Sequence, residues 1–212
     1  MTTVSRAGRA SATETRLALV HAAERLVAEH GVSGFSTQLL HLKAGVRNVS
    51  ALQYYFGSRA ALIRSVWSYR MGVINPQRIE LLESASPFDL NAVVEAIILP
   101  LAGQLVPRPE GNYYLRFLER LDRDQEDQFF GPHLETKGLL LALTALRQII
   151  AARYPNSVEI RLRFASIQIT SCLAGLETDI ERGEVAVESL SAMVGALKRS
   201  VVAALLAPEA IA

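Results

Sequence analysis

Helical periodicity is the feature that most constrains the fold of this 212-residue chain. Apolar residues recur with a spacing near 3.6 residues along most of its length, and no stretch sustains the strict alternation of a β-strand. Half of the residues are hydrophobic, which is enough to form a sizeable core. The pattern predicts an all-α protein of about nine or ten helices without strands.

The N-terminal segment predicts a disordered arm followed by one helix. Residues 1–10 have no apolar periodicity, and we expect them to be disordered. Ser11 and Glu14 then fit a capping box, in which each residue satisfies a free amide at the start of a helix. Gly31 can provide the left-handed cap at the other end. A first helix over about 12–30 is therefore expected.

Three further helix starts follow within about thirty residues, each beside a residue that can cap it. Ser36 or Thr37 can cap a second helix that ends at Gly45. Asn48 can cap a third helix over about 49–56, which Gly57 ends, and Ser58 can cap a fourth. The connections between these helices are only two to five residues long, which is typical of helices that pack against one another.

The rest of the chain predicts a series of longer helices separated by proline and glycine. Asn75 and Pro76 suit the cap and first position of a new helix. Pro100 falls inside one segment and is expected to kink or break it. The predicted helices cover approximately residues 75–85, 88–106, 110–125, 132–154, 157–182 and 186–207.

The stretch AGVRNVSALQYYFGSR, residues 44–59, contains polar residues that packing does not require. A short helix, a glycine turn and a second short helix make a helix-turn-helix, whose second helix enters the DNA major groove in DNA-binding proteins. Leu52 and Phe56 lie four residues apart and are expected to be buried. Ser50, Ala51, Gln53 and Tyr54 would then face outward.

The outward residues have side chains suited to contacting DNA. Gln53 can pair with an adenine edge, and Ala51 can contact a thymine methyl group. Arg47, Tyr55 and Arg59 flank the helix where phosphates would pass, and the helix N-termini at Thr37 and Asn48 add positive dipole ends. The predicted DNA-binding residues are Thr37, Arg47, Asn48, Ser50, Ala51, Gln53, Tyr54, Tyr55 and Arg59. Spacing alone equally allows an ordinary helical hairpin with a polar face.

The charge distribution supports an anionic partner at the N-terminal end. Residues 1–60 contain seven Lys or Arg and three Glu, whereas the remainder contains fifteen basic and eighteen acidic residues. The whole chain has a net charge of only +1, so it is not a polybasic nucleic-acid binder. A basic end on a slightly acidic body indicates a local electrostatic footprint.

The same N-terminal residues resemble the TetR family of transcriptional regulators. The resemblance covers about residues 15–65, roughly a quarter of the chain. It rests on Ala22-Ala23, Leu26-Val27, Gly31-Val32, Thr37, Ala44-Gly45-Val46, the run LQYYFGSR from Leu52 to Arg59, and Leu62. Two positions depart from the family pattern: His41 replaces a small residue, and the stretch between Val46 and Phe56 is one residue longer than the commonest form.

The resemblance implies a two-part architecture. Residues 11–60 would form a three-helix helix-turn-helix DNA-binding domain, and residues 61–212 a helical ligand-binding and dimerisation domain. The implied partners are a double-stranded DNA operator, a small-molecule effector and a second copy of the chain. That copy would dimerise through helices near 157–182 and 186–207, whose many small residues permit close packing. The implied function is a repressor whose operator affinity the effector changes.

A second functional class stays open. His41 and the longer turn also suit a helical small-molecule-binding or interaction protein whose DNA-binding end is degenerate. A ligand pocket is expected among helices 88–154 in either case. The predicted ligand-binding residues there are Tyr113, Tyr114, Arg116, Phe117, Arg120 and Phe130.

The remaining motifs argue against an enzyme. The sequence has no glycine-rich phosphate loop and no zinc-type cluster of Cys and His, so we expect no catalytic residues, cofactor or metal. Its single cysteine, Cys172, lies in an apolar run and is expected to be buried. No secretory signal or apolar run of membrane-spanning length occurs, and a cytoplasmic location is expected.

Overall fold

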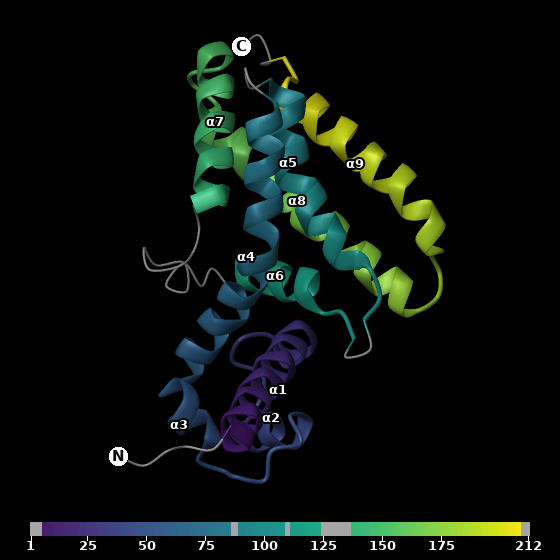
Figure 1. Ribbon diagram of the computed structural model, residues 1–212. Helices are drawn as coiled ribbons and strands as arrows, with labels where there is room; N and C mark the ends of the chain where they lie inside the picture. The colour runs from purple at the N-terminus through teal and green to yellow at the C-terminus, as the bar shows by residue number, and fades with distance from the viewer. Residues whose placement is uncertain (1–5, 86–88, 109–110, 124–136, 209–212) are drawn as a thin grey trace.

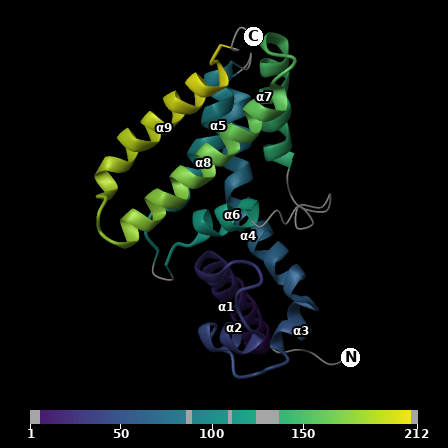
Figure 2. The same ribbon diagram turned by 180° about the vertical axis from the view of Figure 1, so that it is seen from behind.

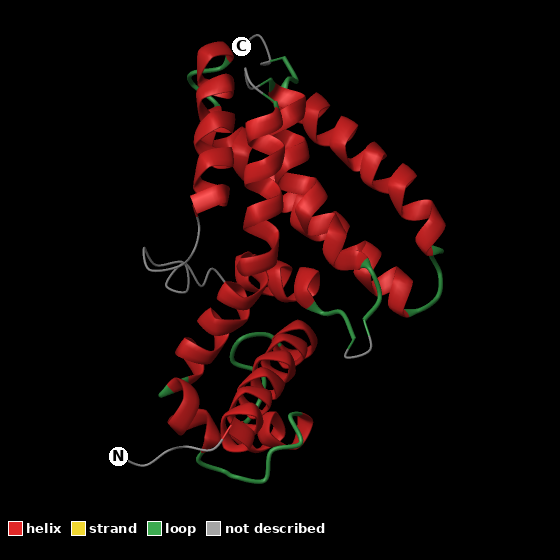
Figure 3. Cartoon of the chain, viewed as in Figure 1, coloured by secondary structure: helices red, strands yellow, loops and turns green. Residues whose placement is uncertain are grey.

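The computed structural model describes residues 6–85, 89–108, 111–123 and 137–208, and it is helical in each of these ranges (Figure 1). No strand occurs in the described part of the chain, where loops alone connect the helices (Figure 3). The prediction of an all-α fold is confirmed.

Three helices gather at the N-terminal end of the molecule: α1 (Arg6–His30), α2 (Thr37–Lys43) and α3 (Ala51–Phe56). Figure 1 places them below the remaining helices. Helix α1 begins earlier than predicted, so Ser11 lies inside it and does not cap it. The alanines in its first two turns explain the longer helix, because alanine has the highest helix propensity. Residues 1–5 of the predicted arm lie outside the described residues.

Helix α4 (Arg59–Ser84) connects the two ends of the molecule and corrects the prediction of a new helix at Asn75 and Pro76. The helix continues through Pro76. Asn75 is buried, and its Oδ1 accepts a hydrogen bond from Arg78 Nη1 at 2.8 Å, so it does not serve as a cap. Packing of α4 against α5 and α7 favours the unbroken helix, because tertiary burial contributes more to helix stability than local propensity does.

The remaining helices form the upper body. They are α5 (Leu90–Ala102), η1 (Gly103–Leu105), α6 (Tyr114–Arg123), α7 (Lys137–Arg153), α8 (Val158–Glu181), η3 (Val187–Ser189) and α9 (Leu190–Leu205). Pro100 does not break its segment, since α5 continues to Ala102 before it tightens into η1. Helices α8 and α9 pack side by side, as the view from behind shows (Figure 2).

Helix α6 lies between the two ends of the molecule, where it packs against α1 on one side and α8 on the other. Each of the nine α-helices in the described ranges contributes buried apolar residues to one core. Helix α3 contributes only Ala51 as a fully buried residue. None of the helices in these ranges combines the length and apolar composition that a membrane span requires.

A buried ion pair joins α1 to α4. Arg70 donates from Nε to Glu24 Oε2 at 2.7 Å and from Nη2 to Glu24 Oε1 at 2.5 Å. Both side chains are only 2% exposed, and Arg70 Nη1 also lies 3.5 Å from Gln104 Oε1 in η1. Burial alone would lower the pKa of Arg70, but the hydrogen bonds and charge of Glu24 raise it. Arg70 therefore stays charged inside the protein.

Candidate nucleic-acid interface and internal cavity

Both ends of α2 are built as the sequence predicts. At its start, Ser36 caps the helix, since its Oγ accepts a hydrogen bond from the Leu39 amide at 3.1 Å. Gly45 follows with φ of 65°, a conformation that glycine adopts without steric cost. The Val46 amide then donates to the His41 carbonyl at 3.0 Å and closes the turn.

The entry to α3 differs from the prediction, because Asn48 does not cap the helix. Its Oδ1 accepts a hydrogen bond from the Ser50 amide at 3.0 Å, and its carbonyl accepts one from the Ala51 amide at 3.0 Å. Asparagine side chains commonly stabilise such turns by bonding to the backbone two residues on. Helix α3 consequently begins at Ala51, and Ser50 occupies the cap position without a side-chain capping bond.

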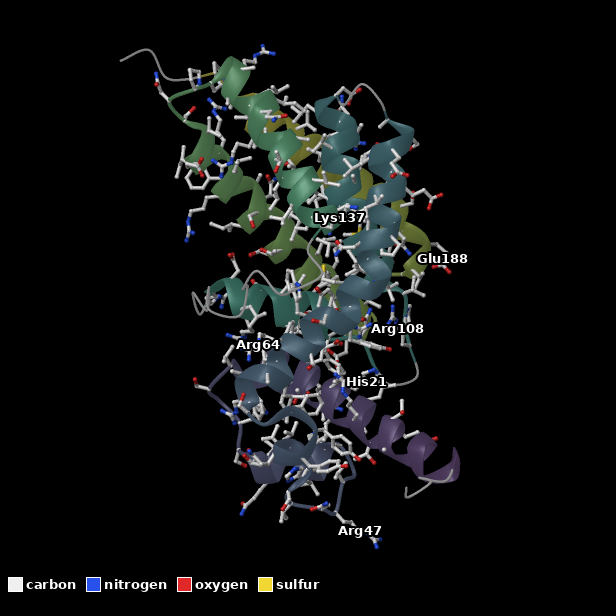
Figure 4. All side chains as sticks on the ribbon, turned by 60° about the vertical axis from the view of Figure 1, so that its left-hand side comes forward. His21, Arg47, Arg64, Arg108, Lys137 and Glu188 are labelled. Atoms are coloured by element: carbon white, nitrogen blue, oxygen red, sulfur yellow. The ribbon has the colours of Figure 1, made fainter. Side chains whose placement is uncertain are left out.

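Six of the nine predicted DNA-binding residues are exposed together on α2, the turn and α3: Thr37, Arg47, Asn48, Ser50, Gln53 and Tyr54. Tyr54 is 80% exposed and lies edge-on to the half-buried Tyr55, with ring centroids 4.9 Å apart. Arg47 is at the far end of the molecule and points away from it (Figure 4). The structure adds exposed Lys43, whose position beside the glycine turn was the only signal for it in the sequence.

Ala51 does not face outward, which corrects one predicted base contact. It is 1% exposed and belongs to the core. Because α3 starts at Ala51, its inward face is formed by Ala51, Leu52, Tyr55 and Phe56, of which the last three are half-buried. The exposed face is therefore limited to Gln53 and Tyr54 within the helix, together with the turn that precedes it.

Arg59 also has a different environment from the one predicted. Its Nη1 donates to the Val32 carbonyl at 3.5 Å, its Nη2 donates to the Phe35 carbonyl, and its guanidinium lies 4.1 Å from the centre of the Phe35 ring. These contacts tie the start of α4 to the loop before α2, because the carbonyls of that loop need donors. Arg59 therefore has a structural role within the chain, and its contact with a phosphate stays a prediction.

We expect Arg59→Ala to lower the free energy of unfolding by about 1–3 kcal/mol, since hydrogen bonds from a charged donor contribute that much. Urea denaturation followed by circular dichroism measures the change. Arg47→Ala is the matched control, because Arg47 is exposed and its loss should change stability by less than about 0.5 kcal/mol. Equal stability of the two variants would contradict the structural role.

His41, one of the two departures from the TetR pattern, is buried inside the helix-turn-helix with 6% of its surface exposed. Its Nε2 has no hydrogen-bond partner among the described residues. The imidazole therefore neither points to solvent nor alters the exposed surface of α3.

A cavity of about 190 Å³ lies within the upper body, between α4, α5, α6, α7 and α8. Its polar lining residues are Arg78, Asp122, Ser166 and Thr170. Its apolar lining residues are Trp67, Met71, Ile97, Leu101, Leu118, Leu139, Leu143, Leu146, Leu162, Ala165 and Ile169. A mostly apolar wall with a few polar groups is typical of small-molecule sites.

None of the predicted ligand-binding residues in the described ranges lines this cavity. Tyr114 and Phe117 are fully buried core residues whose rings stack with centroids 5.9 Å apart. Tyr113 lies between the guanidinium groups of Arg25 and Arg116, each 5.0 Å from its ring centre. Arg120 is half-buried, and Phe130 lies outside the described residues. Aromatic content alone could not separate the core face of α6 from its cavity face.

Arg116, another predicted ligand anchor, belongs to a cluster that attaches α6 to α8. Glu177 accepts from the Leu115 and Arg116 amides at 3.0 Å each and from Arg116 Nε at 3.1 Å. Arg116 also pairs with Glu181 at 2.6 Å. Burial raises the pKa of Glu177 to about 7, although these hydrogen bonds act to lower it. Glu177 thus satisfies amides at the start of α6 from a neighbouring helix.

Neither a protein-family model nor a curated protein sequence matches the chain. In the described part of the chain, no group of three or more His, Cys, Asp or Glu side chains is arranged to hold a metal ion.

Solved structures do resemble the chain. A TetR family transcription regulator from Marinobacter aquaeolei VT8 aligns with a TM-score of 0.53 at 15% identity, over 91% of this chain and 97% of that one. Two others align with lower scores: a mutant of HlyIIR (0.47, 16% identity, 93% and 99% covered) and NalD from Pseudomonas aeruginosa (0.46, 20% identity, 89% and 96% covered). The chain therefore shares the fold of the Marinobacter transcription regulator along nearly its whole length.

Proposed function

We propose that this protein is a TetR family transcriptional regulator that binds a double-stranded DNA operator and responds to a small-molecule effector. The observation that carries the proposal is the exposed polar surface of the α2–turn–α3 unit, formed by Arg47, Asn48, Ser50, Gln53 and Tyr54 at the far end of the molecule. These side chains take no part in packing the core, so they are available to contact a partner. Likeness to the Marinobacter regulator supports the same function through the fold.

The geometry suits entry of α3 into the major groove, which is roughly 12 Å wide and accepts one helix. Gln53 and Tyr54 would then face base edges and sugars, while Arg47 and Lys43 would lie near phosphates. In this proposal, residues 11–60 form the DNA-binding domain and residues 61–212 the effector and dimerisation domain. Because His41 is buried, it does not change the exposed surface, and the longer turn is the one remaining feature that suits a degenerate DNA-binding end.

We expect Gln53→Ala to weaken binding to the preferred duplex by about 1–3 kcal/mol and to relax selectivity at one base pair, because glutamine pairs bidentately with adenine. The preferred duplex is selected in vitro from a random pool, and binding is measured by fluorescence anisotropy on that duplex and a scrambled one. Gln77→Ala is the control, since Gln77 is an exposed glutamine on α4 far from α3. Equal losses on both duplexes would mean that Gln53 only positions the protein. Failure of the wild type to select any sequence would refute the proposed function.

The dimer interface is proposed on the exposed face of α8 and α9. Ile160, Phe164 and Ile167 are 46%, 60% and 40% exposed on α8, and Met193 is 37% exposed on α9. The three residues on α8 follow the spacing of one helical face, and Gly175 continues it. Large apolar side chains exposed together on one face are typical of an interaction site.

Two neighbouring residues on α8 limit the extent of the proposed interface. Ala174 is 2% exposed and belongs to the core of the single chain, so it does not lie in the proposed interface. Cys172 is exposed although its apolar neighbours predicted burial. Cys172 differs from the prediction because α8 turns Leu173 and Ala174 inward, which leaves Cys172 and Gly175 exposed.

Effector control requires two states of the dimer. Two recognition helices must lie about 34–36 Å apart to reach successive major grooves on one side of B-DNA. An effector that binds one spacing better than the other shifts the population and changes operator affinity. The proposed direction is repression relieved by the effector.

A further inference from the structure

Arg78 is a buried cation in the wall of the otherwise mostly apolar cavity. It is 1% exposed and extends from α4. Its Nε donates to the Ala96 carbonyl at 3.1 Å, and its Nη1 donates to Asn75 Oδ1 at 2.8 Å. A guanidinium has five N–H donors, so these two bonds leave Nη2 without an acceptor among the described residues.

Arg78 also has no carboxylate partner in the described ranges, unlike the equally buried Arg70, which pairs with Glu24. Asp122 lines the same cavity, but it is exposed at the end of α6, and water screens its charge. Burial lowers the pKa of Arg78 to about 10, which still leaves it protonated at neutral pH. An uncompensated buried charge is costly, and proteins normally pair it.

We infer that the cavity binds a small monocarboxylate with an apolar body, whose carboxylate pairs with Arg78. The inference deepens the proposed function by assigning the chemical class of its effector, and it rests on that function only for the regulatory consequence. Arginine presents its donors as a planar fork that matches a carboxylate in a bidentate pair. Leu118, Leu146 and Ile169 would enclose the apolar body.

The volume of the cavity limits the size of the apolar part of the ligand. A protein cavity of about 150 Å³ lined by apolar residues holds benzene, so the space of about 190 Å³ here suits a single ring or a short branched chain with one carboxylate. Benzoate, phenylacetate and 4-methylpentanoate are appropriate probes. Benzamide has nearly the shape of benzoate without its charge, and benzylamine reverses the charge.

Trp67 provides a direct readout, because it lines the cavity and is the only tryptophan in the sequence. We expect titration at neutral pH to show benzoate, or another of the three carboxylates, binding about 30-fold more tightly than its matched amide, the range that a charged hydrogen-bonded pair contributes. Benzylamine should not bind. The assignment is overturned if the amide binds as well as the acid, if benzylamine binds more tightly, or if no carboxylate changes the emission at millimolar concentration.

Variants identify the residue responsible. Arg78→Met should reduce the preference for acid over amide to less than about threefold, whereas Arg78→Lys should retain a preference because it keeps the charge. Asp122→Asn should leave the preference for acid over amide unchanged. If Asp122→Asn lost this preference and Arg78→Met kept it, the assignment would be contradicted. If Arg78→Met does not fold, the comparison of acid and amide binding to the wild type still tests whether the cavity prefers a carboxylate. The titrations contain no DNA, so their failure leaves the proposed DNA binding standing, and failed operator binding leaves the cavity assignment standing.

Discussion

Replacing Glu24 by alanine should lower the free energy of unfolding by about 3–5 kcal/mol, because it leaves the Arg70 guanidinium charged and unpaired inside the protein. Both side chains are 2% exposed, and two hydrogen bonds of 2.7 and 2.5 Å join them. Urea denaturation followed by circular dichroism measures the loss.

The exposed pair within α1 provides the control. Glu29 accepts from Arg25 Nε at 2.7 Å, but the two side chains are 27% and 40% exposed. Glu29→Ala should therefore cost less than about 1 kcal/mol. The double replacement Glu24→Leu with Arg70→Met should recover much of the loss, since it leaves no buried charge. A cost for Glu24→Ala no larger than that for Glu29→Ala would show that the buried pair is not needed for stability.

Gly175→Arg should convert the dimer to a monomer and weaken operator binding by at least about 100-fold, because a monomer loses the avidity of two linked half-site contacts. A Cβ atom at Gly175 meets nothing within 4 Å in the single chain, so the substitution leaves the monomer fold intact. The charge and volume of arginine would enter the proposed interface on α8. Light scattering and anisotropy on the selected duplex measure the two effects.

Gly72→Arg is the matched control for this substitution. Gly72 is exposed on α4, and a Cβ atom there also meets nothing within 4 Å. It should remain dimeric with unchanged DNA affinity. Ala174→Arg, one position before Gly175, should instead unfold the chain, because Ala174 is in the core. If the Gly175 variant stays dimeric, the interface lies on another face.

The sequence predicted the positions of the helices better than the tertiary contacts between them. Helical periodicity, with Ser36, Gly45, Gly57 and Ser58 as local signals, located the helices of the N-terminal end because caps and turns depend on nearby residues. The same local rules failed at Pro76, where packing of α4 against α5 and α7 overrides the preference of proline for a helix start. Such tertiary contacts have no signature in a short window of sequence.

The candidate sites also divide into features set by local sequence, which were predicted, and features set by tertiary contacts, which were not. The exposed polar residues of the helix-turn-helix were predicted because spacing alone indicates which side chains the core does not need. The exposure of Ala51 was predicted wrongly, and the contact of Arg59 with Phe35 was not predicted. The start of α3 at Ala51 and the direction of the Arg59 side chain both depend on three-dimensional contacts. A pocket was expected among residues 88–154, but its lining residues were not predicted, because Trp67 and Arg78 of α4 and Ile169 of α8 meet only in three dimensions.

The ion pair between Glu24 and Arg70 also determines where this chain can be recombined with another. A chimera that fused residues 1–60 to a foreign helical body would bury Glu24 without its arginine and leave Leu62, Ile63 and Val66 behind, although they share the core with α1. A junction placed in α4 after Arg70 keeps both the charge pair and this packing. The transplantable unit of the DNA-binding end is therefore longer than its helix-turn-helix, and it includes the first three turns of α4.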